Sequence, residues 1–384
     1  MECDTLPKLF VRRCEKYGDK RIAMRRKEYG IWQKYTWKDY YQKVRRFCLG
    51  LISLGLEPGE RVIMVGDNDP EWFWADLGIE AAGGMPAAIF TDVTPPEMKY
   101  FLDYSDAVFA VVNDQEQVDK ILQAKDELPQ LRKVIYWDSR GLKNYEDPIL
   151  MSFNEVLALG KSSEERNPKL FEQMVEKGKG ADIALLALTS GTTGALPKSV
   201  LLSYNYFLGN LAAMLQAGDF RGTDEYVSFV PLAWIVDQVM LSISLQIGTT
   251  INFPEEPETV QQDLQEISPD VIVNSSKLWE SMLSLVQIRV NDAGFLKRFI
   301  YGLLLPVGHR MADLRFQNIE PNWLWKAPAA LGEVAVSRPL RDKIGLMKIR
   351  TAYTMGAALS PDAFRFFHTI GVNIKQWYGI TDGG

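Results

Sequence analysis

Short apolar runs alternate with amphipathic stretches from Arg61 towards the end of the chain. The runs are bounded by polar and turn-forming residues, as buried strands are, whereas the stretches between them place apolar residues at helical spacing. Strands that alternate with helices form a mostly parallel sheet with helices on both faces. In the first half we expect strands at 62–65, 85–89, 107–112 and 134–137, with helices at 70–82, 95–104 and 115–124 between them.

The rest of the chain extends this pattern. After a leading helix, aromatic and polar residues alternate at 29–37, which predicts a strand pair, and residues 39–54 carry apolar side chains at helical spacing. The polar stretch 138–180 predicts a surface connector, so we divide the chain into α/β subdomains at 1–180 and 181–384. In the second subdomain we expect strands at 183–188, 226–231, 250–253, 271–273, 349–353 and 373–377, helices at 204–216, 260–267, 278–290 and 361–370, and a variable insertion at 295–339.

A loop rich in glycine and hydroxyl residues, from Leu188 to Val200, lies between two apolar stretches. Glycine lets the backbone adopt positive φ and approach a ligand closely, and successive amide groups can then surround phosphate oxygens. Hydroxyls add donors, and Lys198 adds a positive charge. The pattern predicts an anion-binding loop, with a flexible surface turn as the alternative. It is not a Walker A loop, because Pro197 precedes the lysine where that motif has glycine.

Composition narrows the function classes. Of the 384 residues, 47% are hydrophobic and 24% are charged, and the formal net charge is −6, which argues against a general nucleic-acid surface. The three cysteines lack metal-site spacing, so we expect reduced thiols in a cytoplasmic protein. The two histidines lie far apart, which argues against a zinc site or a serine–histidine hydrolase. We expect neither a secretory signal at 1–10 nor a membrane-spanning helix. Peripheral membrane contact stays open.

The ordered string of the loop resembles a known signature. Thr-Ser-Gly-Thr-Thr-Gly at 189–194, followed by Pro-Lys, is similar to the phosphate-binding signature of the adenylate-forming enzymes, and further similar stretches follow in that family's order. They are Pro-Leu-Ala-Trp at 231–234, Ser-Ser-Lys-Leu-Trp-Glu at 275–280, Gly-Ala-Ala-Leu-Ser at 356–360 and Gln-Trp-Tyr-Gly-Ile-Thr-Asp at 376–382. Together they look most like bacterial long-chain fatty-acyl-CoA synthetases.

The resemblance implies an α/β fold and a set of site residues. The fold is the large N-terminal domain of such an enzyme, with two mostly parallel sheets flanked by helices in αβαβα layers, and without the terminal barrel and lid. Trp234 and Gln238 would line the acyl pocket, and Asp382, where relatives have glutamate, would hold Mg²⁺. The implied catalytic residues are Thr192, Lys198 and Thr381. The implied nucleotide-binding residues are Thr189, Ser190, Gly191, Thr193, Gly194, Gly356, Ala357, Ala358, Trp377, Tyr378 and Gly379.

The implied reaction has two steps. A fatty acid and ATP form acyl-adenylate, and coenzyme A then takes the acyl group. The sequence departs from the family pattern in three respects. First, the phosphate loop has Ala195 and Leu196 where relatives have one residue, and Ser199 where they have glycine. Second, the chain ends after Asp382, before the family's ribose-binding aspartate and catalytic lysine. Third, the Pro-Pro-Arg element before Trp279 is degraded. We therefore expect impaired turnover by this chain.

Two other classes stay open. One is a non-catalytic remnant that binds nucleotide or an acyl chain. The other is an adenylate-forming enzyme for an aromatic or other carboxylic acid; the amino-acid version lacks its usual aspartate. The pattern leaves the acyl chain length and the oligomeric state open.

Overall fold

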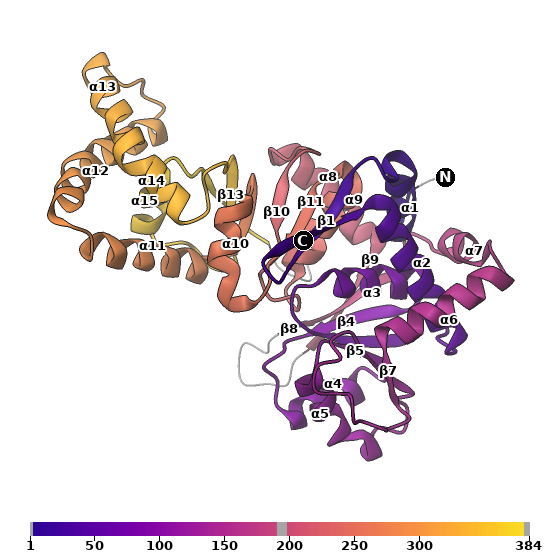
Figure 1. Cartoon of the computed structure of the whole chain (residues 1–384). Helices are drawn as coiled ribbons and strands as arrows, with labels where there is room; N and C mark the ends of the chain where they lie inside the picture. Colours follow the sequence, from indigo (N-terminus) through magenta and orange to yellow (C-terminus); the bar gives the residue numbers. More distant parts are fainter. Residues whose placement is uncertain (1–2, 190–197, 380–384) are drawn as a thin grey trace. The chain divides into compact units, whose positions relative to one another are not determined.

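A five-stranded parallel sheet carries most of the alternation predicted for the first half of the chain (Figure 1). The computed structural model describes residues 3–189 and 198–379. The strand order is β4-β3-β5-β6-β7, and the predicted strands of this half are confirmed. The bounds are β3 (Arg61–Val65), β4 (Met85–Ile89), β5 (Ala107–Val112), β6 (Lys133–Tyr136) and β7 (Leu150–Ser152).

Successive side chains of this sheet face opposite sides, and both sides are buried. Ile63 and Val65 of β3 join a core with α4 (Pro95–Tyr104) and α5 (Gln115–Leu122). Their neighbours Val62 and Met64 are also fully buried, on the other face. The near-continuous apolar runs of the sequence follow from this double burial.

Helix α3 (Pro70–Ala81) is buried on all sides, with only Glu71 partly exposed. It packs against α1 (Leu6–Tyr17), α2 (Trp37–Ser53) and β4. A helix that is apolar around its whole circumference belongs in a core, and Trp72, Phe73 and Trp74 lie there, as the sequence predicts. The same helix also carries two buried carboxyl groups, Asp76 and Glu80.

The predicted connector at 138–180 is wrong as a description of structure, because it contains β7, α6 (Phe153–Arg166) and α7 (Leu170–Lys177). Ser152 caps α6 with Glu155 in a capping box. Few apolar residues suffice for α6 because its buried face is narrow and lies close against α2, where the rings of Phe47 and Phe153 stack at 4.4 Å.

Replacing Gly160 with alanine is expected to destabilise this helix crossing. A Cβ there would lie 1.7 Å from the Arg46 carbonyl oxygen, which is backbone and cannot rotate away. We expect the free energy of unfolding to fall by about 1–3 kcal/mol, as for other overpacked sites. Gly302→Ala is the matched control, because a Cβ at that helical position meets no atom within 4 Å and helix propensity improves. Equal stability of the two variants in urea unfolding would contradict the prediction.

Further strands lie outside the five-stranded sheet. β1 (Ile22–Glu28) pairs antiparallel with β2 (Ile31–Thr36) and parallel with β11 (Thr250–Phe253). The predicted strand pair therefore exists, but the bounds 29–37 are wrong, because that stretch holds only one strand, β2, and the turn before it. β8 (Ile183–Thr189) and β9 (Lys198–Ser203) form an antiparallel hairpin. The helices that follow β9 are α8 (Tyr204–Ala217) and α9 (Ile235–Ile247).

The chain divides into two compact units. Among the described residues, unit 1 comprises 3–189, 198–222 and 228–253, and unit 2 comprises 223–227 and 254–379. In unit 2 the parallel order is β10-β12-β13-β14. The subdomain boundary at residue 180 falls inside unit 1 and stays a prediction. The elements of unit 2 are β10 (Glu225–Val227), α10 (Val260–Ile267), β12 (Val271–Ser275), α11 (Ser276–Asn291), α12 (Phe295–Phe316), α13 (Trp323–Gly332), α14 (Arg338–Lys343), β13 (Thr351–Met355), α15 (Pro361–Thr369) and β14 (Ile374–Gln376).

The irregular insertion expected at 295–339 is instead mostly helical. Helices α12 and α13 occupy much of it, and each contains a proline, Pro306 and Pro328. Proline normally ends or kinks a helix because it lacks an N–H and clashes with the preceding turn. Because proline normally argues against a helix, the sequence pattern did not predict α12 and α13.

Candidate functional site

The glycine-rich turn after β13 lies beside the segment after β14 in unit 2. The two strands are parallel neighbours, so their carboxyl ends share one edge, where ligands bind in open α/β sheets. Gly356 has a φ of 85°, which favours glycine, and a Cβ there would meet no atom within 4 Å. Gly356, Ala357 and Ala358 are exposed. The turn thus presents bare backbone at this edge.

Gln376 links the turn to the final described segment. Its amide nitrogen lies 3.4 Å from the Ala357 carbonyl oxygen and 3.3 Å from that of Thr354, and its amide oxygen accepts from the Leu359 N–H at 3.4 Å. The Trp377 N–H donates to the Thr354 carbonyl at 2.8 Å. Gln376 had no assigned role in the sequence analysis. The sequence feature that could have indicated this linking role is a side-chain amide, which can both donate and accept hydrogen bonds, at the end of a strand.

Two aromatic side chains at this edge behave differently. Trp377 stacks on the buried ring of Tyr353 with 4.2 Å between the ring centroids, so its side chain packs onto the core of unit 2, to which it belongs. Tyr378, the next residue, is 97% exposed. An exposed ring on an anchored backbone, beside a bare glycine turn, offers a stacking surface to a planar ligand. Gly379 follows and is exposed as well.

Trp279, from the stretch 275–280, is part of the core of unit 2. It is fully buried, its indole N–H donates to the Tyr353 carbonyl at 3.1 Å, and its ring meets Phe367 edge-on at 4.8 Å. Trp279 therefore supports the same strand, β13, from which the glycine turn leaves.

In unit 1 a side-chain network holds the segment that contains Trp234. The Asn68 amide donates to the Ser228 hydroxyl at 2.8 Å, the Val230 carbonyl at 2.9 Å and the Asp237 carboxylate at 3.0 Å. Asn68 follows the carboxyl end of β3, and the sequence analysis missed it. A polar residue in the loop after a buried strand was the signal that could have identified it.

The two predicted acyl-pocket residues lie at the start of α9. Trp234 directly precedes α9 and is half-buried. Gln238 is buried and lies against the carboxyl group of Asp76 in the interior of unit 1. Contact of either residue with an acyl chain stays a prediction.

The predicted phosphate loop connects two paired strands. Thr189 ends β8 and Lys198 begins β9, and these two residues are register partners in the hairpin. Ser190, Gly191, Thr192, Thr193 and Gly194 lie outside the described residues, as do the departures at Ala195 and Leu196. The catalytic candidate Thr381 and the metal candidate Asp382 also lie outside them. Within 3–189 and 198–379, no three His, Cys, Asp or Glu side chains gather as a metal site.

Comparison with solved structures shows the class of fold. The anthranilate CoA ligase AuaEII in complex with anthranoyl-AMP has a TM-score of 0.69 at 17% identity, over 98% of this chain and 59% of that one. The N-terminal domain of FACL13 from Mycobacterium tuberculosis has a TM-score of 0.66 at 14% identity, over 98% of this chain and 76% of that one. The fold is therefore that of the N-terminal domain of adenylate-forming enzymes, as the sequence predicts.

Residues 10–384 match the AMP-binding enzyme family, and the chain belongs to this family. It is 28% identical over 387 residues to the long-chain-fatty-acid–CoA ligase ACSBG2 of Xenopus laevis, over 98% of this chain and 51% of that protein. It is 26% identical over 389 residues to ACSBG1 of Rattus norvegicus, over 98% of this chain and 52% of that protein. The chain thus spans about half the length of these relatives.

Proposed function

We propose that the protein acts as, or contributes the nucleotide-binding part of, an AMP-forming ligase that activates a long-chain fatty acid and transfers it to coenzyme A. The observation that carries the proposal is the edge of unit 2, where Gln376 joins the glycine turn to the segment that exposes Tyr378. Sequence similarity to long-chain-fatty-acid–CoA ligases at 26–28% identity favours this substrate class.

The proposed chemistry uses positioning more than covalent catalysis by the protein. A carboxylate oxygen of the fatty acid attacks the α-phosphorus of ATP, and pyrophosphate leaves. The thiolate of coenzyme A then attacks the acyl carbon, and AMP leaves. In this proposal adenine lies flat on Gly356–Ala358 under the ring of Tyr378, and residues 189–194 with Lys198 hold the phosphates. Such fixed contacts act through orientation and charge stabilisation.

Mg²⁺ would be held by the carboxylate of Asp382, since hard cations prefer oxygen ligands. It would neutralise phosphate charge when bound. Thr192 and Thr381 would donate hydroxyl hydrogen bonds to the phosphates. We place the reaction in the cytoplasm, as expected from the reduced cysteines.

The test compares acids and partial reactions. The polypeptide is incubated with Mg-ATP and saturated acids of eight to twenty carbons, or with anthranilate, and pyrophosphate release and acyl-CoA are measured separately. Release of pyrophosphate with long-chain acids supports the proposal, and preference for anthranilate favours the aromatic alternative. ATP binding without any pyrophosphate release identifies a binding remnant. Because the 384 residues cover half of each relative, we expect nucleotide binding to exceed turnover when this length is assayed alone.

Replacing Trp234 with alanine is expected to shift the preferred acyl chain length. The indole stands half-buried at the start of α9, on a segment fixed by Asn68 and Ser228, so its removal enlarges any cavity beside it without releasing the backbone. We expect relative adenylation of the longest acids to rise severalfold. Tyr29→Ala, which removes an exposed ring between β1 and β2 of unit 1, is the control. An unchanged chain-length profile would place Trp234 outside the acyl pocket.

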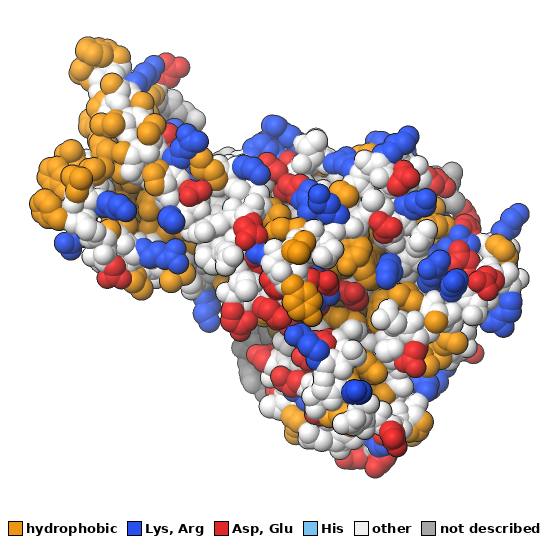
Figure 2. Space-filling view, in the orientation of Figure 1, with side chains coloured by type: hydrophobic (Ala, Val, Ile, Leu, Met, Phe, Trp, Pro, Cys, Tyr) orange, Lys and Arg blue, Asp and Glu red, His pale blue; other side chains and the backbone are white. Residues whose placement is uncertain are grey.

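Peripheral membrane contact is part of this proposal, and one surface of unit 2 supports it. Hydrophobic side chains gather over α12 and α13 (Figure 2). No helix among the described residues is long and apolar enough to cross a membrane. The exposed apolar residues of this surface, here called the apolar face, are Phe295, Leu296, Phe299, Leu303, Phe316, Ile319, Trp323, Leu324, Trp325 and Leu331.

Exposed cations accompany the apolar face. Lys297, Arg298, Arg310 and Lys326 are all exposed within it, although the chain as a whole carries a net charge of −6. Aromatic and aliphatic side chains beside lysine and arginine are typical of helices that lie in the interface of an anionic bilayer. We therefore take an anionic lipid surface as the occupant. It would also be a source of long-chain acid.

The membrane prediction is tested with vesicles of phosphatidylcholine with and without phosphatidylserine. Reversing both Lys297 and Arg298 to glutamate is expected to weaken binding to the anionic vesicles at least tenfold, since each cation near such a surface contributes about 1 kcal/mol. Trp323→Ser with Leu324→Ser should weaken it similarly. Tyr29→Ser removes a ring from unit 1 that is still more exposed than Trp323, and it should leave binding unchanged. Concentration-dependent dimerisation without vesicle binding would contradict the assignment.

A further inference from the structure

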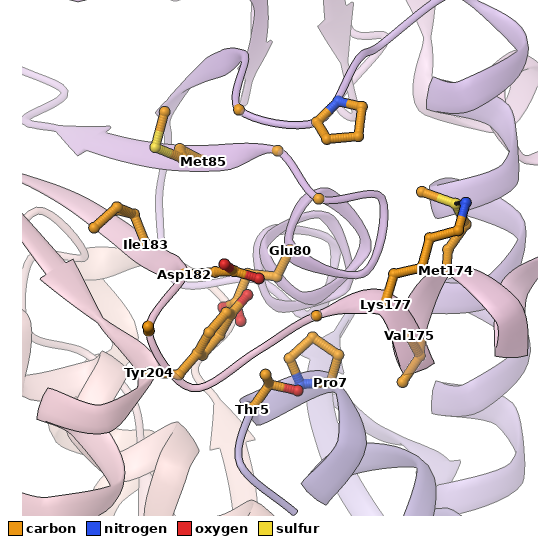
Figure 3. A pocket seen from close by; sticks show the side chains of 16 residues that line it. Thr5, Pro7, Glu80, Met85, Met174, Val175, Lys177, Asp182, Ile183 and Tyr204 are labelled. Carbon is orange, nitrogen blue, oxygen red and sulfur yellow. Dashed lines mark hydrogen bonds between the residues drawn. The ribbon is translucent and has the colours of Figure 1, made fainter.

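A pocket of about 560 Å³ opens in unit 1 at the amino ends of β4 and β8 (Figure 3). Met85 and Ile183, the first residues of these strands, line it together with Pro7 and Pro58. Its size suits a small-molecule ligand. It lies at the opposite end of β8 from the predicted phosphate loop, so the proposed ligase chemistry does not use it.

Three polar side chains from different elements meet in this pocket. Figure 3 shows Glu80, Asp182 and Tyr204 pointing toward one another. Glu80 comes from α3, Asp182 immediately precedes β8, and Tyr204 is the first residue of α8. Two backbone hydrogen bonds fix this arrangement. The Tyr204 N–H donates to the Asp182 carbonyl at 3.1 Å, and the Lys179 N–H donates to the Asp182 carboxylate at 2.8 Å.

Glu80 is the unusual member of the three. It is only 5% exposed, and the Tyr204 hydroxyl donates to its carboxyl group. Its second oxygen, Oε2, is buried and has no hydrogen-bond partner among the described residues. Native proteins rarely leave a buried carboxyl oxygen without a donor. A donor at this oxygen can come from the pocket that Glu80 lines.

The lysines nearest the pocket do not provide that donor. Lys177 lines it, but its Nζ lies 3.6 Å from the Met174 sulfur, and no ion pair joins it to Glu80 or Asp182 in the described chain. Lys8 donates to Asp4 at 2.7 Å and to the Gly178 carbonyl at 2.8 Å. Besides the Lys177 ammonium group, the pocket presents two carboxyl groups and the hydroxyls of Thr5 and Tyr204, and the Thr5 hydroxyl already accepts from the Lys8 backbone N–H at 3.3 Å.

We propose that this pocket binds a primary amine, with the ammonium group between Glu80, Asp182 and Tyr204 and the alkyl part against Pro7, Met85 and Ile183. An ammonium is a compact cation with three N–H donors. Glu80 Oε2, the Asp182 carboxylate and the Tyr204 hydroxyl oxygen offer three acceptors. The apolar walls favour a ligand whose remaining surface is hydrocarbon.

The electrostatics of α3 agree with a cation at this position. Burial, together with the charge of Asp76 one turn away, raises the pKa of Glu80 well above its ordinary value. Burial likewise raises the pKa of Asp76 to about 7. A nearby positive charge favours the ionised form of a carboxyl group. An ammonium would thus offset the cost of burying these groups.

The experiment compares n-hexylamine with n-hexanol, which has the same hydrocarbon part and no charge. Binding to the 384-residue chain is measured by calorimetry, with Glu80→Gln and Asp182→Asn as test variants. Asp103→Asn removes an exposed carboxylate on α4, away from the pocket, and is the matched control. We expect saturable binding of the amine alone, at least tenfold weaker in both test variants and unchanged in the control.

Other outcomes overturn the proposal. Equal binding of the alcohol and the amine would mean an apolar cavity without charge recognition. Amine binding that persists in both test variants would reflect general attraction to an acidic protein. Absence of saturable amine binding would mean that Glu80 is simply a protonated core residue. If Glu80→Gln fails to fold, Asp182→Asn carries the test by itself, because Asp182 is exposed and the asparagine side-chain oxygen can still accept from the Lys179 N–H. ATP binding serves as an independent check on folding.

Discussion

Replacing Arg26 with alanine is expected to lower the free energy of unfolding by about 3–5 kcal/mol. Arg26, on β1, lies with Nε 3.1 Å from the Asp69 carboxylate and with a terminal guanidinium nitrogen 3.4 Å from that of Glu71. Asp69 is buried and also accepts from the Trp137 indole N–H at 2.9 Å. Removing one partner of a buried ion pair leaves an uncompensated charge, which is why the expected loss is large.

The loss should depend on pH in a defined direction. Burial raises the pKa of Asp69 to about 7 even with Arg26 beside it, whereas the unfolded chain has the ordinary value near 4. The folded state therefore binds a proton that the unfolded state releases, and this group's contribution to stability falls as the pH rises from about 4 to 7. Without Arg26 the ionised form is still less favourable, so the variant should lose more at pH 8 than at pH 4.5.

Denaturant unfolding at both pH values checks this prediction. Arg140→Ala is the control, because its ion pair with Asp138 lies at the surface, where the arginine side chain is 78% exposed, and such pairs contribute little. A loss for Arg26→Ala no greater than for Arg140→Ala would mean that solvent already screens the buried carboxylates. An equal loss at both pH values would contradict the assignment of the effect to Asp69.

Replacing Tyr378 with alanine is expected to raise the dissociation constant of ATP about 5- to 150-fold. Stacking of a base on an aromatic ring contributes roughly 1–3 kcal/mol in alanine substitutions. The Tyr378 ring is exposed, while the neighbouring Trp377 ring stacks on Tyr353, so the substitution removes ligand contact without disturbing the core. The effect on folding should be small.

Calorimetric titration with ATP and Mg²⁺ measures this effect. Tyr378→Phe keeps the ring and should retain most of the affinity. Gln376→Ala should weaken binding by a different route, since it releases the glycine turn from the segment that carries Tyr378. ATP affinity unchanged in Tyr378→Ala would remove the support for adenine stacking at this edge.

Periodicity predicted the parallel sheet well because its strands are buried on both faces and short turns bound them. The pattern did not predict the helices of 138–180. The buried face of α6 is narrow, and at Gly160 the backbone of α6 lies directly against the backbone of α2, so no large apolar side chain marks the contact. The pattern failed again at 295–339, where Pro306 lies inside a helix. In both cases tertiary packing outweighed the local signal.

The candidate site also has a part that the sequence predicted and a part that it did not. Motif order predicted the turn at 356–358 and the segment at 376–382 as site residues, and the structure places that turn beside residues 376–379. Their role in nucleotide binding stays a prediction. Motif order did not identify Gln376 as the link, nor Asn68 as the anchor of the segment before α9, because those roles arise only when distant strands come together. A hydrogen bond across more than 100 residues, such as that from Asn68 to Val230, has no local signature.

The path of the chain through unit 2 limits how that unit can be produced by itself. Strand β10 precedes the rest of unit 2 in the sequence, separated by residues 228–253, which fold with unit 1. It pairs with β12 through Tyr226 and Val271. A fragment that starts at Pro254 would lose this strand and expose the edge of β12, which invites edge-to-edge aggregation. A fragment that starts at Thr223 would keep β10 but carry α9 and β11 without their partners. Unit 2 is therefore not an independent segment of the chain, and crystallisation or domain grafting requires a polypeptide that contains both units.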